Sequence, residues 1–292
     1  MRESARRDNY LAFSGLPWAQ EVRGSNPRAP TNSVLILNAK RMCTLTFVPS
    51  EDGYLAGMNR DELLTRPPAL PPMILERDGM EIVCPRESSG GTWIACNSEG
   101  NLLALLNWNE IDTRFLGEKR KTRGIVISQL IQESDPSTTP SHFGLLRLEG
   151  VFPFRLIAVF RKEKVIHERR WDGAHKHTLD FPWARKHWFS SSLSDASAER
   201  ERGRVCEEAA ADGVVGTREW LRSLHRSHVP APGPFSVCVH RPDAATVSYT
   251  EIECGNSRIS MGYLKGNPCL KAGLDGVTSL DLRERRAPQP RA

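Results

Sequence analysis

Long hydrophobic runs are absent from this sequence. The longest run near its N-terminus is Val34-Leu35-Ile36-Leu37. A membrane-spanning helix requires about 18 apolar residues, and a signal peptide also requires a longer apolar core than this one. The sequence therefore predicts no membrane span and a cytoplasmic location.

Basic stripes with interleaved aromatic residues are also missing. The net charge is only +5, and the arginines are scattered among acidic residues. Nucleic-acid-binding domains gather their basic residues into a patch or stripe, so we expect no nucleic-acid partner. With 292 residues, 39% of them hydrophobic and 26% charged, the chain is long enough for one globular domain with tails.

No two cysteines form a CxxC pair. The seven cysteines are Cys43, Cys84, Cys96, Cys206, Cys238, Cys254 and Cys269. Without such pairs the spacing suggests neither a zinc knuckle nor a redox motif. Six of the seven are expected to be small buried side chains in a reducing compartment. Isolated histidines such as His175, His177 and His240 are more often structural than haem ligands. We therefore predict no metal and no cofactor, and Cys43 alone needs separate treatment.

Residues 1–41 do not read like the rest of the chain. They show neither strand alternation nor helical periodicity, and Gly24–Thr31 is a cluster of structure-breaking residues. At Met42 the pattern changes at once to strand, turn and strand. We expect Met42 to be the true start, so that 1–41 is a mistranslated or disordered extension; a removable propeptide and a genuine disordered arm are the alternatives. The predicted domain covers 42–272, and the proline- and arginine-rich segment 273–292 is expected to be a disordered tail.

Strand patterns occur in runs that are separated by helical patterns. Hairpins are predicted for Cys43–Val48 with Tyr54–Met58, Gly91–Cys96 with Asn101–Asn107, and Phe235–His240 with Thr246–Glu251. Further strands are predicted at Phe154–Phe160, Lys164–Arg169 and Arg258–Leu264, and helices at Arg123–Glu133, Ala196–Ala211 and Thr217–His225. This order favours a layered α+β fold over a parallel doubly wound sheet. The proline-rich segment Thr65–Arg77 is either a rigid surface connection or a wall of the functional site.

The turn of the first hairpin places polar residues beside Cys43. Closing this hairpin around Pro49–Gly53 puts Asn59 opposite Cys43, and Arg60 and Asp61 follow at the end of the strand. In the second hairpin the turn at 97–100 puts Asn107 at the end far from the turn, opposite residue 90. If both hairpins belong to one sheet, all these polar groups share one edge.

This set of residues meets the needs of an N-terminal nucleophile. The Cys43 thiolate would attack a carbonyl, and the free α-amino group of the same residue would accept the thiol proton. An α-amino group titrates at about 7.7–8.0, so no histidine is needed. Arg60 would lower the pKa of the thiol, Asp61 would orient the amine, and the Asn107 amide would stabilise the oxyanion.

Plainer interpretations of the same residues stay open. The run Asn59-Arg60-Asp61-Glu62 also fits a polar strand end with a structural arginine–carboxylate pair. Asn107 also fits an amide that caps a turn. Cys43 is an ordinary strand cysteine if its amino group is blocked by a peptide bond.

Taken in order, several motifs resemble the NRDE family, which is named for its Asn-Arg-Asp-Glu run. They are Met42–Phe47, Met58–Glu62, Gly90–Trp93 and Leu106-Asn107, and the resemblance continues through 153–156 and 235–241 to 250–252. The family includes bacterial proteins and the eukaryotic transport and Golgi organisation protein. The initial Met-Cys pair and the later motifs also resemble choloylglycine hydrolase and penicillin V acylase.

Those enzymes are N-terminal nucleophile hydrolases with a four-layered αββα sandwich, and the resemblance implies that fold here. It implies catalytic residues among Cys43, Asn59, Arg60, Asp61 and Asn107. Two departures are visible: the asparagine and arginine come in altered order, and a second asparagine expected on a later strand is replaced within 188–192.

Two functions remain possible from the sequence. One is an amidohydrolase or thioesterase that uses Cys43 to cleave a C–N or C–S acyl bond. The other is a non-catalytic protein that binds or carries an acyl, acyl-CoA or haem ligand. Either function implies a small acyl-containing partner or a similar ligand, whereas the substrate itself and the oligomeric state are not determined by the sequence.

Overall fold

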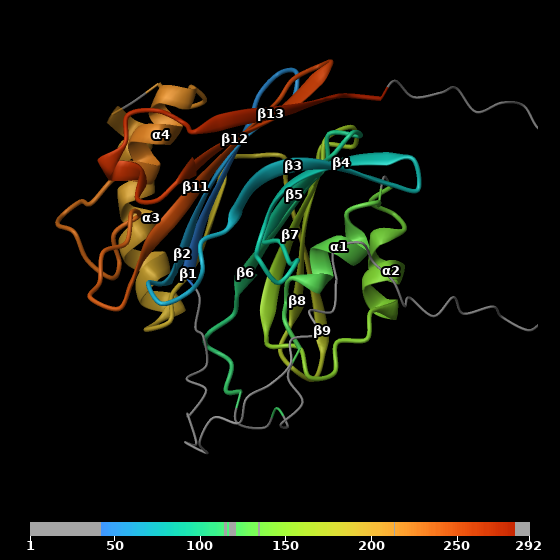
Figure 1. The fold of residues 1–292 in the computed structure, drawn as a ribbon, viewed down its shortest axis with the longest axis horizontal. Helices are drawn as coiled ribbons and strands as arrows, with labels where there is room; N and C mark the ends of the chain where they lie inside the picture. The colour runs from blue at the N-terminus through green and yellow to red at the C-terminus, as the bar shows by residue number, and fades with distance from the viewer. Residues whose placement is uncertain (1–41, 114–115, 117–120, 134, 213, 284–292) are drawn as a thin grey trace, which may run out of the picture. The chain divides into compact units, whose positions relative to one another are not determined.

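Two antiparallel β-sheets form the centre of the fold (Figure 1). The computed structural model describes residues 42–113, 116, 121–133, 135–212 and 214–283, all of which belong to the compact unit Ile36–Ala292. The predicted extension 1–41 and the last nine residues, 284–292, lie outside the described residues.

Sheet A has six strands and sheet B has seven. The strands of sheet A, in spatial order, are β10 (Lys186–Ser190), β1 (Met42–Pro49), β2 (Tyr54–Leu63), β11 (Ala244–Cys254), β12 (Arg258–Lys265) and β13 (Gly276–Asp281). The strands of sheet B are β3 (Leu70–Arg77), β4 (Met80–Arg86), β5 (Ile94–Asn97), β6 (Leu102–Asn107), β7 (Phe154–Phe160), β8 (Val165–Trp171) and β9 (Lys176–Phe181).

The main hydrophobic core lies between the two sheets. Sheet A contributes Leu45, Phe47 and Met58, and sheet B contributes Ile94 and Leu106, all of which are buried. Side chains alternate between the two faces of a strand. The intervening residues therefore point outward, toward the helices.

Helices cover the outer face of each sheet. On sheet A, α3 (Asp195–Asp212) and α4 (Arg218–Arg226) form a second core in which Leu221 of α4 packs near Leu55 of β2. On sheet B, α1 (Ile125–Leu130) and α2 (Thr139–Leu145) form a third core that includes Phe143 and Phe154. The order helix, sheet, sheet, helix confirms the predicted α+β fold and its four-layered αββα sandwich.

Helix α4 begins at a well-formed N-terminal cap. The Thr217 side chain accepts a hydrogen bond from the Trp220 backbone nitrogen at 3.1 Å, which satisfies one of the free amides of the first turn. Glu219 lies in the first turn, and His225 and Arg226 lie in the last, an arrangement that suits the helix dipole. The cap fixes the residue at which α4 begins, and the helix then packs over β2.

The registers of the first two hairpins differ by one residue from those we predicted. In the first, Pro49 pairs with Tyr54, so Cys43 lies opposite Arg60 and not opposite Asn59. The turn closes one residue later than expected, through a hydrogen bond from Ser50 N to Gly53 O at 2.9 Å. In the second hairpin, β5 and β6 show the same shift. A slip of one residue moves each side chain to the other face of its sheet, and this decides the position of Asn59.

The third predicted hairpin is wrong in its first strand. Strand β11 pairs with β2 and β12, and residues 235–240 form no strand apart from a bridge between His240 and Ala245. Two of their amides bond to the preceding loop, from Cys238 N to Ser227 O at 3.0 Å and from His240 N to Gly233 O at 3.1 Å, and the Val239 carbonyl oxygen accepts from Thr246 N of β11 at 3.1 Å.

Two further boundaries need correction. Residues 276–281 form β13 and pair with β12. The prediction of a disordered tail from residue 273 is therefore wrong for these residues. Part of the proline-rich segment 65–77 forms β3, which turns into β4 at Asp78-Gly79, both with positive φ angles. Such a pair is a common hairpin turn, a signal that was present in the sequence. The predicted helices and the other predicted strands are confirmed within a few residues.

Candidate active site at the start of strand β1

Cys43 lies near the start of β1, between β10 and β2. Its register partners are Ser190 on one side and Arg60 on the other. The thiol belongs to the core between the two sheets and is only 5% exposed. Its backbone nitrogen donates to Ser190 Oγ at 2.9 Å. The residue is therefore held from both neighbouring strands.

The charges around Cys43 have opposing effects on its thiol. Burial and the nearby Asp61 carboxylate raise the pKa of the Cys43 thiol to about 12, while Arg60 and the Asp61 backbone amide lower it. Burial has the largest effect because a thiolate is poorly solvated in a core. With residue 42 still attached, the thiol is protonated at neutral pH.

The Arg60 side chain crosses the space between the two sheets. Its Nη2 atom donates to Glu62 at 3.2 Å and to Glu87 at 2.9 Å, and its guanidinium lies 4.5 Å from the centre of the Trp93 ring. The Nε atom is buried and has no hydrogen-bond partner among the described residues. Arg60 is thus a fixed cation beside Cys43 that retains one unused donor.

Asp61 is the register partner of Met42. Its Oδ1 atom accepts a hydrogen bond from Thr246 Oγ1 at 2.6 Å, and its Oδ2 atom lies 3.8 Å from Arg202 Nη1 without a hydrogen-bond partner in the described part of the chain. Burial raises the pKa of this carboxyl to about 7, although Arg202 opposes the shift. Its Oδ2 atom can therefore accept a hydrogen bond from a further donor.

Asn59 points to the opposite face of sheet A from Cys43. Its Nδ2 atom donates to the carbonyl oxygens of His225 and Val237, both at 2.9 Å. The amide thus connects β2 to the end of α4 and to the segment before β11. The structure does not bring Asn59 to the thiol, so the predicted position of Asn59 opposite Cys43 is wrong.

Asn107 lies at the end of β6 in sheet B. The two predicted hairpins therefore belong to different sheets, and the single sheet edge that we considered does not form. Figure 1 shows that β6 ends at the same end of the sandwich at which β1 begins. Two residues further on, Asn109 N donates to Asp195 Oδ2 at 2.7 Å, and the other oxygen of Asp195 accepts from Ser191 N at 2.6 Å. These bonds join the end of β6 to the end of β10.

Sequence reasoning missed two residues that contact Cys43 directly. Ser190 lies within 188–192, where the resemblance indicated a replaced asparagine, so a signal for it was present. Arg202 of α3 is fully buried and donates to Thr44 Oγ1 at 2.8 Å and to the Cys43 carbonyl oxygen at 3.4 Å. No pattern distinguishes it from the neighbouring arginines of the same helix.

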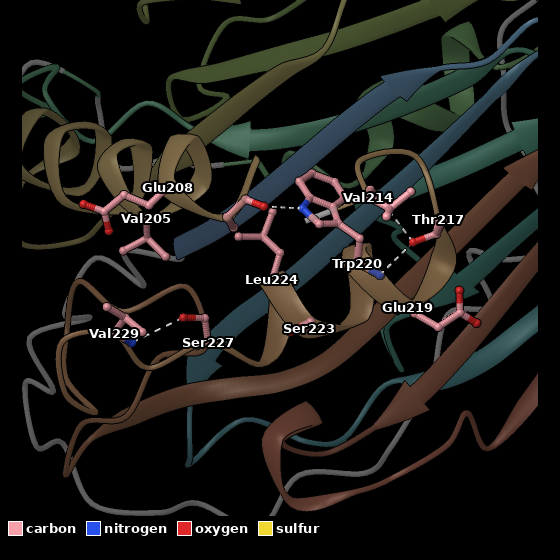
Figure 2. Close-up of a pocket in the computed structure, with 11 residues that line it drawn as sticks. Val205, Glu208, Val214, Thr217, Glu219, Trp220, Ser223, Leu224, Ser227 and Val229 are labelled. Carbon is pink, nitrogen blue, oxygen red and sulfur yellow. Dashed lines mark hydrogen bonds between the residues drawn. The ribbon is translucent and has the colours of Figure 1, made fainter. Parts of the chain in front are cut away.

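A groove of about 640 Å³ lies between α3 and α4 (Figure 2). Val205, Trp220 and Leu224 contribute to its lining, and Trp220 Nε1 donates to the Ala209 carbonyl oxygen at 2.8 Å. None of the predicted site residues lines it. No helix of the described residues is long and apolar enough to cross a bilayer.

Two solved structures are similar to this chain at low identity. Penicillin V acylase from Agrobacterium tumefaciens is 10% identical with a TM-score of 0.46, and the match covers 82% of this chain and 86% of that one. A mutant of conjugated bile acid hydrolase from Clostridium perfringens is 9% identical with a TM-score of 0.42, and the match covers 84% of this chain and 97% of that one.

The family comparison is more informative. None of the curated proteins with which the sequence was compared matches it. The family model for transport and Golgi organisation 2 matches residues 42–209, which is more than half of the chain. The chain therefore belongs to the transport and Golgi organisation 2 family.

Proposed function

We propose that this protein is an N-terminal cysteine hydrolase that cleaves an amide or thioester acyl bond after residue 42 has been removed. Cys43 is the nucleophile, and its own α-amino group is the base. The observation that carries the proposal is the buried Oδ2 atom of Asp61, at the register position opposite residue 42. It lies 3.8 Å from Arg202 Nη1 and has no hydrogen-bond partner among the described residues. A buried carboxylate oxygen without a donor is costly, and an α-ammonium group at Cys43 would supply the donor.

Removal of residue 42 would also make room for a substrate. Met42 is 1% exposed and packs against Val239 and Ala244, and Arg241 Nη1 lies 3.5 Å from its sulfur. Loss of this side chain would leave an apolar recess with a cation at its edge, directly beside the new amine. Such a recess suits the apolar part of an acyl group.

The reaction then proceeds in two steps. The α-amino group takes the proton of the Cys43 thiol, and the sulfur attacks the acyl carbon. The amino group next gives that proton to the departing nitrogen or sulfur, which leaves the acyl group on Cys43 as a thioester. Water attacks this thioester with the amino group again as base, and releases the acid and the free thiol.

Three neighbours support these steps. Arg60, on the neighbouring strand β2, stabilises the thiolate because its positive charge lowers the pKa of the Cys43 thiol. Asp61 orients the amine. Asn107, at the same end of the sandwich, is the proposed side-chain donor to the oxyanion, and loss of one such donor costs about 10²–10³ in rate.

A non-catalytic role in binding acyl or acyl-CoA ligands is the second candidate. The observation that favours it is the burial of Cys43, which raises the pKa of its thiol to about 12 while residue 42 is attached. A chain that keeps residue 42 has no α-amino base at Cys43 and a protonated thiol. It could bind an acyl ligand without cleaving it.

The test compares two forms of the same protein that differ by one residue. In one form the chain begins at Cys43; in the other a single glycine precedes Cys43. Both are incubated with chromogenic acyl amides and acyl thioesters, and intact mass spectrometry is used to detect an acyl group on Cys43. We expect turnover and a transient acyl adduct only in the form that begins at Cys43.

Cys43→Ser and Cys43→Ala are the active-site controls, and Cys206→Ala, at a buried cysteine of α3, is the matched control. Equal turnover in the glycine-blocked form, or turnover that survives Cys43→Ala, contradicts the proposed chemistry. Ligand binding by both forms without release of any acyl group favours the carrier function.

A further inference from the structure

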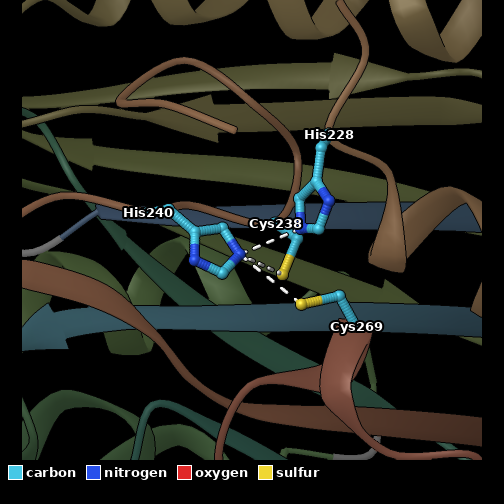
Figure 3. Close-up of side chains that lie close together, drawn as sticks. All are labelled: His228, Cys238, His240 and Cys269. Carbon is cyan, nitrogen blue, oxygen red and sulfur yellow. Dashed lines mark hydrogen bonds between the residues drawn. The ribbon is translucent and has the colours of Figure 1, made fainter. Parts of the chain in front are cut away.

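Two histidines and two cysteines converge beside sheet A, outside the site described above (Figure 3). His228 follows α4, Cys238 and His240 precede β11, and Cys269 lies in the short 3-10 helix η1 (Pro268–Leu270). Their ligand atoms all lie within 4.8 Å of one another. Side chains from three separate segments of the chain are thus brought to one point.

The distances between these atoms match a tetrahedral metal site. His240 Nε2 lies 2.9 Å from His228 Nε2, 3.5 Å from Cys269 Sγ and 3.8 Å from Cys238 Sγ. In a tetrahedral zinc site with bonds of about 2.0–2.1 Å to nitrogen and about 2.3 Å to sulfur, the nitrogen–nitrogen edge is about 3.3 Å and the nitrogen–sulfur edge about 3.6 Å. Small movements of the two rings would reach these values.

Hydrogen bonds alone do not account for this arrangement. The Nε2 atom of an imidazole carries either one hydrogen or one lone pair, yet three ligand atoms face the Nε2 atom of His240. One of the three contacts can be a full hydrogen bond, and the other two cannot. A cation at the centre would interact favourably with all four ligand atoms.

Asn267 supplies an outer contact that suits two metal-bound cysteines. Its side-chain amide lies 2.8 Å from Cys238 Sγ, 3.1 Å from Cys269 Sγ and 3.4 Å from His240 Nδ1. The oxygen and nitrogen of an amide are interchangeable at such a position. Turned so that its nitrogen faces the sulfurs, the amide would donate to thiolates, as groups around bound metals commonly do.

The position of the cluster favours a structural ion. Cys238 is buried and the other three side chains are half-buried. All four positions of a tetrahedral ion are taken by protein atoms, which is typical of structural sites; catalytic sites keep one position open. Two sulfur and two nitrogen ligands in a tetrahedron favour zinc among the common divalent metals.

We propose that His228, Cys238, His240 and Cys269 bind one Zn²⁺ ion in a closed tetrahedral site. The two thiols release their protons when the ion binds. The ion holds the loop after α4, the segment before β11 and the helix η1 together. Val239, which lies between two of the ligands, packs against Met42, so the ion also stabilises one wall of the space around residue 42.

The full chain is the protein to test. It is expressed with zinc in the medium, and its metal content is measured by inductively coupled plasma mass spectrometry. We expect about one zinc per chain. After removal of the metal by a chelator, titration with Zn²⁺ against a chromogenic competitor is expected to give one site with nanomolar or tighter affinity. Chelation is also expected to lower the melting temperature reversibly.

Variants separate this cluster from other zinc-binding side chains. Cys269→Ser, at a half-buried position, is expected to weaken zinc binding at least about 100-fold, since a lost metal ligand costs more than the 10–100-fold of an outer contact. Cys206→Ser, at a buried cysteine outside the cluster, is expected to bind zinc like the parent. Co²⁺ substitution provides a readout independent of stability: the thiolate-to-cobalt absorption should fall by about half in Cys269→Ser, which keeps one of two thiolates.

The proposal is overturned if the zinc-loaded chain carries no stoichiometric metal, or if Cys238→Ser/Cys269→Ser binds zinc as tightly as the parent. A Cys238–Cys269 disulfide in metal-free protein from zinc-supplemented cells would also overturn it, as would iron in place of zinc. None of these outcomes depends on hydrolase activity, so the zinc site and the proposed function stand or fall separately.

Discussion

The Oδ2 atom of Asp61 lies 3.8 Å from the Nη1 atom of Arg202, and neither side chain is exposed. The separation is too long for a hydrogen bond, so the pair is held by charge alone while other contacts fix each partner. Thr246 fixes Asp61, and Thr44 fixes Arg202. The pair therefore couples β2 to α3 directly behind Cys43.

Breaking this pair should strongly destabilise the folded protein, because it leaves one buried charge without its partner. We expect Asp61→Asn and Arg202→Met each to lower the free energy of unfolding by about 3–5 kcal/mol. The double variant should lose clearly less than the sum of the two. Urea denaturation of the four proteins well above pH 7, where a carboxyl with a pKa of about 7 is ionised, gives the coupling energy.

An exposed ion pair provides the control for this cycle. Arg258 and Asp281 are 3.1 Å apart on neighbouring strands, but their side chains are 63% and 81% exposed. The same cycle with Arg258→Met and Asp281→Asn should give a coupling below about 1 kcal/mol. Additive losses at the buried pair would show that Asp61 and Arg202 do not interact in the folded protein.

His225 should make the protein sensitive to acid. Burial lowers the pKa of His225 to about 3, below the value of about 6.5 for an unfolded histidine. Between these values the unfolded state binds more protons, so stability rises with pH up to about 6.5 and is lost as the pH falls. His225→Gln should reduce the slope of unfolding free energy against pH by about 1.4 kcal/mol per pH unit between pH 4 and 6.

Asp61 should change the free energy of unfolding with pH in the opposite direction to His225, over a similar pH range. Its pKa of about 7 in the folded protein lies above its ordinary value of 3.8, so the folded state binds more protons between these values. The stability that the folded state gains by holding this proton is fully present below pH 4 and is lost as the pH rises through 7. Asp61→Asn should therefore steepen the rise in stability with pH that His225→Gln flattens. Changes of the same sign in both variants would contradict the two pKa shifts.

Gly91 and Gly124 bring two backbone segments into close contact. A Cβ atom at residue 124 would lie 2.9 Å from the Gly91 Cα atom, whereas one at Gly144 of α2 would meet nothing within 4 Å. Gly124→Ala should thus destabilise the protein by about 1–3 kcal/mol through overpacking. Gly144→Ala should stabilise it by up to about 1 kcal/mol through helix propensity. Thermal denaturation of both variants checks the pair, and a neutral Gly124→Ala would show that this contact is loose.

Alkylation rates should report the state of the Cys43 thiol. With one glycine before Cys43, the high pKa of about 12 predicts that iodoacetamide labelling rises about tenfold per pH unit between pH 7 and 10, because only the thiolate reacts. In the form that begins at Cys43, we expect faster labelling at pH 7 and a weaker dependence on pH. Peptide mapping separates Cys43 from the other six cysteines. Identical profiles in the two forms would remove the proposed role of the α-amino group.

Local sequence determined most of the helices and strands, and it placed Cys43 near the start of the first strand. The turn residues between β1 and β2, and between β5 and β6, predicted both hairpins because turn chemistry acts over a few neighbouring residues. The order of strands and helices was enough to predict a layered α+β fold. The motif resemblance identified the family, which the match over 42–209 confirmed.

The tertiary structure decided which of these residues meet. The one-residue register shift, set by the closure of a single turn, turned Asn59 to the helix side and Arg60 toward the facing sheet. The placement of β6 in sheet B and the contact of Arg202 with Cys43 depend on packing between distant segments. The cluster of His228, Cys238, His240 and Cys269 follows no spacing rule, because its members come from three separate segments of the chain that only the folded protein brings together.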